Sequence, residues 1–383
     1  MKILWLTWKD RENPASGGAE LVNEELAKRL VADNHEVILL VAGFSGAPME
    51  ETKNGYKIIR VGSRWSVYWQ AYKYYKKNLL GWPDLVIDEV NTIPFFFKFY
   101  SKIKGAEVKN ILFVHQLCRE IWFYEMFFPL NLIGYLLEPI YLWSLSDRKV
   151  VTVSESTKKD LMRFGFKAEN INIISEGIEI EPVVDLANIK KFDQPTVLAH
   201  GTIRAMKRTD HIIRAFEIAK EKIPNLRLIV SGAAEGRYGK KVLKMIDESK
   251  YNDSIEYTGP VSKDKKIELM QKSQLFCAAS VKEGWCLVVT EAASQGAPAV
   301  VYDVDGLRDS VKSDETGMVC TSETPECMAG NIVKCLDYNG RYEQFRSLGW
   351  ERSGHMNFDN SYCDLMKFIK SIFLTENLPS HKI

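Results

Sequence analysis

The sequence predicts an α/β protein built from two doubly wound domains that face a cleft. Apolar runs of strand length alternate with amphipathic stretches of helix length along the chain, which is typical of parallel sheets covered by helices on both faces. A polar, weakly patterned stretch near 179–194 interrupts this alternation, which then starts again. At 383 residues the chain is also longer than one hydrophobic core usually serves.

Each half of the chain contains six apolar runs that we expect to form strands. In the first half these runs are 3–7, 36–41, 56–61, 84–89, 111–115 and 149–153. In the second half they are 196–201, 226–232, 255–259, 275–279, 299–303 and 317–320. Amphipathic stretches such as 18–33 and 209–222 should form the helices between them. We therefore place the first domain at 1–185 and the second at 194–355. Ligands of such domains gather at the carboxyl ends of the strands.

Composition and charge exclude several classes of protein. Lys and Arg total 51 against 50 Asp and Glu, so net charge gives no reason to expect a nucleic-acid partner. The seven cysteines form no CxxC pair, which is typical of reduced, buried thiols in a cytoplasmic protein. The apolar run at the start of the chain is too short for a signal peptide, and we expect it to be the first strand.

The most informative stretch carries two carboxylates, Glu283 and Glu291, around an expected turn from strand to helix. The helix should begin near Leu287, and the slender residues Gly284 and Cys286 let the amides before it face outward. Free amides at a helix start attract an anion such as phosphate. Because carboxylates repel phosphate, the hydroxyl groups of a ribose or hexose are their natural ligands. The structural alternative is a surface loop followed by a glutamate that caps the helix.

A cationic turn lies before the expected helix 209–222. Arg204, Lys207 and Arg208 follow the strand that ends at Gly201. Cations at a helix start oppose the helix dipole unless an anion joins them. A diphosphate would resolve this conflict, with Lys207 and Arg204 neutralising the charge of a departing nucleotide diphosphate. The alternative is that these side chains are solvated.

Two turns that contain glycine follow expected strands. Gly17 and Gly18 open the first helix, where they allow close approach of the backbone to a ligand and offer amides to an anion. Gly232 and Gly236 form a weaker version in the second domain. Neither turn has the GxGxxG spacing of a dinucleotide site, and a tight turn between strand and helix is the alternative for both.

A histidine and an aspartate pair complete the candidates. His115 ends an apolar strand at the edge where the first domain should face the cleft, which favours contact with substrate; a satisfied core histidine is the alternative. Asp303 and Asp305 have the spacing of a metal-binding DxD pair, but aspartates in such a glycine turn commonly cap the backbone. Two hard ligands do not define a magnesium site, and no His and Cys cluster suggests zinc.

A basic, aromatic stretch at 53–82 contains no acidic residue. Its cations are Lys53, Lys57, Arg60, Arg64, Lys73, Lys76 and Lys77. Its aromatic and apolar residues recur at helical spacing as Trp65, Tyr68, Trp69, Tyr72, Tyr75 and Leu79. Such a helix suits contact of 56–80 with an anionic membrane or a phosphate-bearing acceptor. The alternative is a helix that packs its aromatic residues into the core and leaves its lysines in water.

The richly apolar stretch 121–145 is not expected to span a membrane. Glu125, Glu138, Pro129 and Pro139 interrupt it. Two shorter helices at the rim of the cleft fit better.

Together these motifs resemble those of retaining nucleotide-sugar glycosyltransferases of family 4, which have the GT-B fold of two Rossmann-like domains. The resemblance covers nearly the whole chain. Its specific part is the Glu-x7-Glu pattern of Glu283 and Glu291, framed by Gly284-Trp-Cys-Leu-Val and Gly296-Ala-Pro-Ala-Val. Further agreement comes from Gly17-Gly18-Ala-Glu20, Val151-Thr-Val-Ser154-Glu-Ser-Thr157, Ile255-Glu-Tyr-Thr-Gly259 and the distance of Lys207 from Gly201.

The resemblance implies roles for the candidate residues. The nucleotide would lie on the second domain, with Lys207 and an arginine at the diphosphate, Glu291 at the ribose and Glu283 at the hexose. His115 would stand near the anomeric reaction centre, and neither a metal nor another cofactor would be required. The expected catalytic residues are His115 and Glu283, and Glu20 and Arg119 are expected on the acceptor side. The expected donor-binding set is Gly17, Gly18, Arg204, Lys207, Gly232, Trp285, Cys286, Leu287, Val288 and Glu291.

Three positions depart from the pattern of the family. Thr202 stands where an arginine usually follows Gly201, although Arg204 lies two residues later. Cys286 replaces a common glycine, which should alter but not remove the cradle of amides. Glu176-Gly-Ile-Glu179 stands where Asn-Gly-Val-Asp is usual.

The sequence thus predicts a cytoplasmic enzyme, peripheral on the inner face of the membrane, that moves a hexosyl group from a nucleotide diphosphate sugar to a hydroxyl with retention. The acceptor would be a glycan or a lipid-linked precursor. The alternatives are a GT-B-type sugar-nucleotide epimerase or phosphorylase and a non-catalytic protein that binds nucleotide sugars. In this fold the segment 357–375 would cross back to the first domain, with a closure hinge near 179–194 and Met356.

Overall fold

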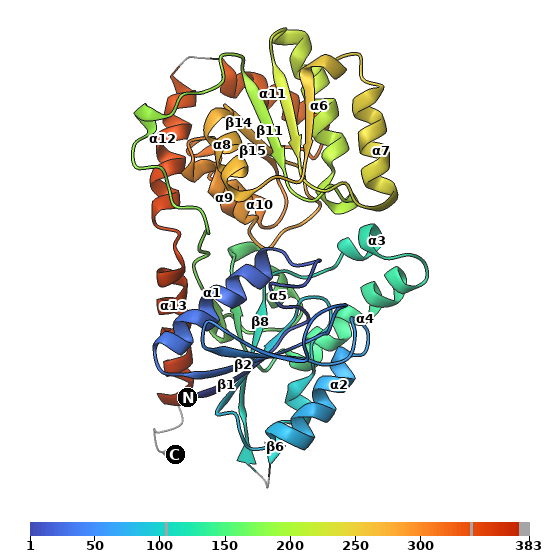
Figure 1. The fold of residues 1–383 in the computed structure, drawn as a ribbon, viewed down its shortest axis with the longest axis vertical. Helices are drawn as coiled ribbons and strands as arrows, with labels where there is room; N and C mark the ends of the chain where they lie inside the picture. Colours follow the sequence, from blue (N-terminus) through green and yellow to red (C-terminus); the bar gives the residue numbers. More distant parts are fainter. Residues whose placement is uncertain (104–105, 338–339, 375–383) are drawn as a thin grey trace. The chain divides into compact units, whose positions relative to one another are not determined.

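The computed structural model describes residues 1–103, 106–337 and 340–374, and its chain divides into two compact units (Figure 1). The first unit contains Met1–Arg119, Ile133–Gly177 and the chain from Asn357 onward. The second unit contains Glu120–Leu132 and Ile178–Met356. The segment 120–132, which the predicted boundary at 185 assigns to the first domain, therefore groups with the second unit.

The first unit is built on a sheet of eight strands in the order β10-β9-β8-β5-β1-β2-β4-β3. All neighbouring strands are parallel except β3 and β4, which are antiparallel. The strands are β1 (Lys2–Leu6), β2 (Glu36–Val41), β3 (Glu50–Lys53), β4 (Tyr56–Arg60), β5 (Leu85–Glu89), β8 (Lys109–Val114), β9 (Lys149–Thr152) and β10 (Ile171–Ile173). The six predicted strands are confirmed, whereas β3 and β10 escaped prediction because short edge strands need no apolar run.

Helices and short turns connect these strands. They are α1 (Gly18–Ala32), α2 (Val67–Tyr74), the π-helical turn η1 (Tyr75–Leu79), η2 (Phe97–Tyr100), α4 (Leu130–Leu145), α5 (Glu155–Arg163), η3 (Ala168–Asn170) and α13 (Phe358–Leu374). A small ribbon pairs β6 (Lys102–Ile103) with β7 (Ala106–Glu107). The terminal helix α13 lies on α1, where Arg29 and Asp359 form an ion pair of 2.7 Å. A Cβ added at Gly177 would lie 2.5 Å from the ring of Phe358, so this glycine allows α13 to approach.

The second unit is built on six parallel strands in the order β13-β12-β11-β14-β15-β16. They are β11 (Thr196–His200), β12 (Arg227–Ser231), β13 (Ile255–Gly259), β14 (Leu275–Ala278), β15 (Ala299–Tyr302) and β16 (Gly317–Cys320), and all six were predicted. The helices are α3 (Ile121–Glu125), α6 (Thr209–Lys222), α7 (Gly236–Asp247), α8 (Lys263–Lys272), α9 (Leu287–Ser294), α10 (Leu307–Ser310), α11 (Pro325–Leu336) and α12 (Arg341–Gly354). The short turns are η4 (Leu186–Asn188), η5 (Ala205–Lys207) and η6 (Asn252–Ser254). The two sheets confirm the predicted fold class.

Both sheets have a point where the order of the strands reverses. In the first unit the reversal lies between β1 and β5, and in the second it lies between β11 and β14. The loops that follow such a pair diverge to opposite faces of the sheet and leave room for a ligand. Candidate residues should therefore be sought after β1, β5, β11 and β14.

No helix in the described ranges is long and apolar enough to cross a membrane. As predicted, 121–145 forms two helices, α3 and α4, with Pro129 between them. All seven cysteines are free thiols. Four of them are buried, as expected, whereas Cys286 and Cys327 are half-buried and Cys363 is exposed.

Candidate functional site

At the switch point of the second unit, the loop after β11 meets the loop after β14. Lys207 ends the turn η5, and Arg208 then adopts a φ of 48° and leads into α6. The Nζ of Lys207 lies 2.5 Å from Oε1 of Glu283, which also accepts a hydrogen bond of 2.6 Å from the hydroxyl of Ser280. Lys207, predicted to bind the diphosphate, and Glu283, predicted to bind the sugar, are thus in direct contact.

The electrostatics of this pair keep Lys207 charged. Burial alone would lower the pKa of Lys207, but the adjacent carboxylate of Glu283 outweighs burial and raises it. The side chains are 27% and 11% exposed, so the pair is only partly open to solvent. A diphosphate that reached Lys207 would therefore compete directly with Glu283 for the ammonium group of Lys207.

The loop that carries Glu283 is held by the predicted DxD pair. The amide of Glu283 donates to the carbonyl of Asp305 at 3.0 Å, and Lys282 Nζ lies 2.5 Å from the Asp305 carboxylate. Asp303 accepts from Arg308 at 2.6 Å, and Asp305 also pairs with Arg308. These cations give both aspartates a structural role, which supports the alternative to a metal site.

The backbone conformation of Cys286 is one that favours glycine. Its φ is 75°, in the left-handed region that L residues rarely adopt, and α9 begins immediately afterwards at Leu287, as predicted. Cys286 therefore keeps the conformation that a glycine would adopt. The indole of Trp285 donates to the hydroxyl of Thr290 at 2.9 Å and so lies against α9. The turn thus places a left-handed residue directly before the first residue of α9.

Glu291, the predicted ribose ligand, is almost completely buried inside α9. Only 2% of the residue is exposed, and its carboxylate lies 2.6 Å from Nζ of Lys266 on α8. Sequence reasoning did not identify Lys266, because nothing in the amphipathic pattern of α8 distinguishes it from the other lysines there. An ion pair of this kind fixes the orientation of Glu291.

The other cations of the turn before α6 already have acidic neighbours. Arg208 lies 2.5 Å from Glu323, and Nε of Arg204 lies 3.8 Å from Glu125 on α3. With the pair of Lys207 and Glu283, every cation of this turn faces a carboxylate. The conflict with the helix dipole is therefore relieved within the protein, and a diphosphate is not needed for that purpose.

Gly232 is required by the packing of two loops. Its φ is +129°, and an added Cβ would lie 2.1 Å from the carbonyl oxygen of Gly201. Its amide donates to the carbonyl of Gly259 at 2.9 Å. These contacts favour the alternative of a tight turn at Gly232.

The turn before α1 is also closed by its own side chains. Helix α1 begins at Gly18, and the amide of Gly17 donates to the carboxylate of Glu20 at 2.6 Å. Lys9 lies 3.3 Å from Glu20 and donates to the carbonyl of Ala15 at 2.6 Å. One amide that was expected to bind an anion is thus used by Glu20, which is itself buried.

At the switch point of the first unit, His115 lies between two buried glutamates. Glu89 ends β5, His115 follows β8, and Glu176 lies in the segment after β10. The His115 Nε2 atom is 3.9 Å from Oε1 of Glu89, and Nδ1 is 4.0 Å from Oε1 of Glu176. The ring of His115 rests against that of Phe113 at a centroid distance of 4.4 Å. The predicted histidine is therefore part of a cluster.

Burial sets the protonation of this cluster. It lowers the pKa of His115 to about 4 and raises the pKa of Glu176 to about 8. The pKa of Glu89 is also raised to about 8, by burial first and by the charge of Glu20 second. Near neutral pH a neutral imidazole therefore lies between two protonated carboxyl groups.

Three atoms of the cluster are buried without a hydrogen-bond partner in the part of the chain that the structure describes. They are Nε2 of His115, Oε1 of Glu89 and Oε2 of Glu176. Buried polar atoms of native proteins are normally satisfied by protein, water or ligand. Glu89 was not among the predicted residues, although a carboxylate at the carboxyl end of a central strand is a usable signal. Glu176 was noted only as a departure from the family pattern.

Arg119, predicted on the acceptor side, is built into the first unit. Its amide donates to Glu138 at 2.7 Å, and its guanidinium donates to the carbonyl of Tyr135 at 3.1 Å. The guanidinium also lies over the rings of Tyr135 and Phe164, at 4.1 and 5.2 Å from their centroids. These contacts give Arg119 a structural role.

The basic, aromatic stretch divides between core and surface. Tyr75 and Leu79 are buried, as the structural alternative expects, whereas Trp65 and Trp69 are 64% and 58% exposed. Three of its cations are paired with carboxylates, in the pairs Lys53–Glu12, Lys57–Glu50 and Arg60–Asp10. The remaining four, Arg64, Lys73, Lys76 and Lys77, form no ion pair with any residue that the structure describes.

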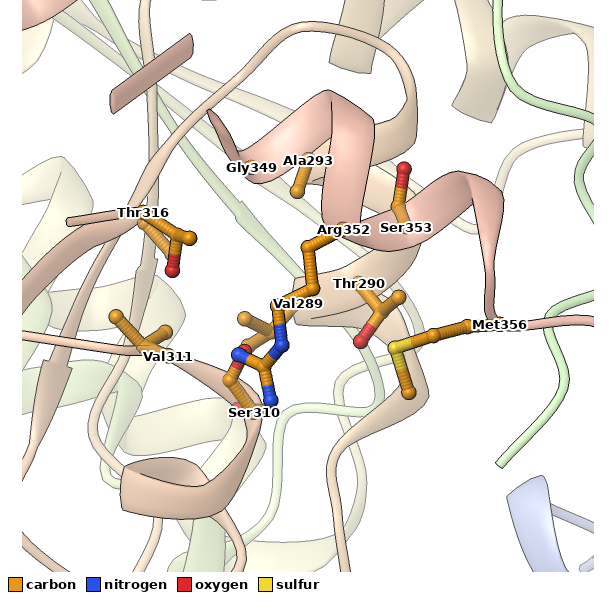
Figure 2. Close-up of a pocket in the computed structure, with 11 residues that line it drawn as sticks. Val289, Thr290, Ala293, Ser310, Val311, Thr316, Gly349, Arg352, Ser353 and Met356 are labelled. Atoms are coloured by element: carbon orange, nitrogen blue, oxygen red, sulfur yellow. The ribbon is translucent and has the colours of Figure 1, made fainter. Parts of the chain in front are cut away.

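A small cavity lies behind α9, where Figure 2 shows Arg352 reaching toward Ser310. Arg352 donates to the carbonyls of Asp309 and Ser310 at 2.7 and 2.9 Å. The volume of about 10 Å³ holds one water molecule at most. This cavity therefore cannot hold a nucleotide, and its arginine stabilises the end of α10.

Two family models match adjacent parts of the chain. Residues 16–182 match the model described as Glycosyltransferase Family 4. Residues 186–350 match the model described as Glycosyl transferases group 1. Together they span both units.

Similar proteins agree with these matches. An uncharacterized glycosyltransferase of Haemophilus influenzae is 30% identical over 200 residues, which are 51% of this chain and 53% of that protein. The chain thus spans about half the length of this relative. Sucrose-phosphate synthase from Thermosynechococcus elongatus has a similar fold, with a TM-score of 0.77, 17% identity and coverage of 98% and 99% of the two chains. The Anabaena protein HepE in complex with UDP-glucose gives a TM-score of 0.69 at 16% identity, covering 97% and 100%.

Proposed function

The chain belongs to the family 4 glycosyltransferases, and on this basis we propose that it transfers a hexosyl group from a nucleotide diphosphate sugar to an acceptor hydroxyl with retention. The observation that carries the proposal is the contact between Lys207 and Glu283 at the switch point of the second unit. A cation for the diphosphate and a carboxylate for the sugar lie side by side there, next to the start of α9.

The donor would bind by exchanging partners within this site. Its diphosphate takes the charge of Lys207 and the amides of the turn Trp285–Val288, which releases Glu283 to accept hydrogen bonds from hexose hydroxyls. Glu291, fixed by Lys266, holds the ribose. As the bond to the sugar breaks, the negative charge on the leaving diphosphate grows, and Lys207 stabilises it.

The neutral imidazole of His115 would support the reacting centre. Its lowered pKa of about 4 keeps it uncharged near neutral pH, so it does not repel the positive charge that develops at the anomeric carbon. Lys207 and the helix-start amides supply the electrostatic stabilisation that a metal ion would otherwise give, and the proposal therefore includes no metal.

The proposal includes a nucleotide-sugar donor and a glycan or lipid-linked acceptor at the cytoplasmic face of a membrane. The donor class is supported by the complex of the similar Anabaena protein with UDP-glucose. Contact of 56–80 with an anionic membrane is supported by Arg64, Lys73, Lys76 and Lys77, which lack carboxylate partners among the described residues.

Substitution of Lys207 and Glu283 tests this function. We expect Lys207→Ala to lower turnover by about 100-fold, because one electrostatic donor to a developing charge has this order of effect. Glu283→Gln should lower turnover similarly. The double variant Lys207→Met with Glu283→Gln removes both charges together, so it should stay folded and remain inactive.

The matched control is the exposed pair of Lys250 and Glu221 in the same unit, with side chains 65% and 59% exposed. Lys250→Ala should leave turnover unchanged. Turnover of Lys207→Ala within about threefold of the parent would refute the assignment. Consumption of donor without an acceptor-dependent product would indicate an epimerase, and donor binding without transfer or hydrolysis would indicate a non-catalytic protein.

A further inference from the structure

Helix α4 presents an apolar face to solvent. Its residues Ile133, Leu136, Leu137, Ile140 and Trp143 are 47%, 58%, 50%, 62% and 72% exposed. They follow helical spacing and so form one continuous stripe, which we call the apolar face of α4. A contiguous exposed apolar patch on a globular protein marks a site of interaction with another protein or with a membrane.

The same helix hides its only charged side chain. Glu138 is 1% exposed and accepts hydrogen bonds of 2.7 Å from the amides of Cys118 and Arg119. Tyr141, Leu142 and Leu145 pack beneath it in the core. The exposed side of α4 between Ile133 and Trp143 therefore carries no charge, which would be unusual for a surface that faces only water.

Helix α2 and the residues that flank it supply cations over the same face of the sheet. Lys73 lies over the ring of Trp69 at 5.1 Å, and Arg64 lies over that of Trp65 at 5.1 Å. Lys76 and Lys77 follow in η1. We call Arg64, Trp65, Trp69, Lys73, Lys76 and Lys77 the basic face of α2.

The turn η2 joins these two faces into one surface. Tyr100 of η2 contacts Tyr72 of α2 at a centroid distance of 5.0 Å, while Phe96 lies 6.2 Å from both Phe99 and Tyr141. Lys98 donates to the carbonyl of Ser144 in α4 at 2.5 Å. Figure 1 shows α2 and α4 on the same side of the sheet of the first unit. Phe99, 63% exposed, extends the apolar area between them.

The charges around this surface favour one kind of partner. The nearby acidic side chains are neutralised by cations: Glu50 pairs with Lys57, and Asp147 pairs with Lys98 and Arg148. What remains is apolar area flanked by tryptophans and by cations that have no carboxylate partner among the described residues. This is the composition of an element that lies in the interface of an anionic bilayer. A protein partner of ordinary composition would not require this separation of apolar and basic faces.

We propose that the first unit docks on an anionic lipid bilayer, with the apolar face of α4 inserted at the acyl boundary and the basic face of α2 against the head groups. This inference rests on the proposed membrane contact of 56–80 and assigns its apolar part to α4. A transferase docked in this way would act on an acceptor that resides in the membrane.

Flotation with vesicles tests the docking without any donor or turnover. The full chain should float with vesicles of phosphatidylcholine mixed with phosphatidylglycerol and much less with phosphatidylcholine alone. Leu137→Gln with Ile140→Gln should lower the partition coefficient by about tenfold or more, because two apolar side chains no longer enter the hydrocarbon. Lys73→Gln with Lys77→Gln should weaken binding to the anionic vesicles and reduce its dependence on salt.

Matched substitutions provide the controls. Val184→Gln changes an apolar side chain that is 96% exposed in the second unit, and Lys367→Gln changes a lysine whose side chain is 78% exposed in the first. Both should bind vesicles as the parent does. Loss of binding in the lysine variant alone would overturn the role of α4 and leave the contact of 56–80 standing. A dimer in solution that Leu137→Gln with Ile140→Gln abolishes, without vesicle binding by the parent, would overturn the proposal in favour of a second copy of the chain.

Discussion

In the second unit, single carboxylates hold the cations of the proposed donor site. Glu283 holds Lys207 at 2.5 Å, and Glu125 and Glu323 face Arg204 and Arg208. Such carboxylates stabilise the cations, and under the proposed function a diphosphate would displace them because it carries more charge and more acceptor oxygens. The exchange at Lys207 would make Glu283 available for the sugar only when the diphosphate is present.

The cluster of the first unit makes stability depend on pH. Below pH 4.5 the carboxyl of Glu176 is protonated in both folded and unfolded states, and up to about pH 8 only the folded state keeps the proton. The free energy of unfolding should therefore fall as pH rises through this window. His115, with a pKa of about 4 instead of 6.5, acts in the opposite direction below pH 6.5, so the interval from 6.5 to 8 excludes the contribution of His115.

We expect Glu176→Gln to remove the contribution of Glu176 to this decline. The contribution should be about 2 kcal/mol between pH 6.5 and 8, from the 1.36 kcal/mol that each unit of pKa difference is worth. Chemical denaturation at several pH values measures it. Glu169→Gln, which alters an exposed carboxylate of the same unit, should leave the pH dependence unchanged. An identical pH dependence in Glu176→Gln and the parent would show that Glu176 titrates as in the unfolded chain.

At the scale of elements, the loops after β11 and β12 depend on close backbone contact. A Cβ at position 232 would lie 2.1 Å from the carbonyl oxygen of Gly201, and the neighbouring strands cannot move apart without losing their ladder. We expect Gly232→Ala to destabilise the second unit by about 3 kcal/mol or more. The substitution should also weaken binding of the proposed donor, because the displaced loop from Gly201 leads to Lys207.

Gly236 gives a matched control for this substitution. It follows the same loop as the first residue of α7, with a φ of +59°, but an added Cβ there would meet no atom within 4 Å among the described residues. Gly236→Ala should therefore cost only about 1 kcal/mol, from backbone strain alone. Equal losses in the two variants, measured by urea denaturation, would show that the contact with Gly201 is not the cause.

At the scale of the whole molecule, each unit has its own sheet, its own core and its own switch point. If the nucleotide binds to the second unit, its stabilising effect should depend on residues of that unit alone. We expect one of UDP, GDP and ADP to raise the melting temperature, since a ligand at a hundred times its Kd stabilises by about 2.7 kcal/mol. Lys207→Ala should reduce this shift, whereas His115→Ala should retain it.

The His115→Ala variant also separates binding from chemistry. It should keep the nucleotide-induced shift in melting temperature and lose turnover. A loss of the shift in this variant would place His115 in nucleotide binding and would contradict its proposed role at the reacting centre.

The sequence by itself determined the two α/β sheets, the start of α9 at Leu287 and the family, because apolar periodicity and local motifs are properties of neighbouring residues. It could not show that Glu283 pairs with Lys207 or that Glu89 and Glu176 flank His115, since these contacts join distant segments. It also could not divide the aromatic residues of 53–82 between core and surface. Burial and protonation depend on the full set of neighbours around a side chain, and only the tertiary structure assembles that set.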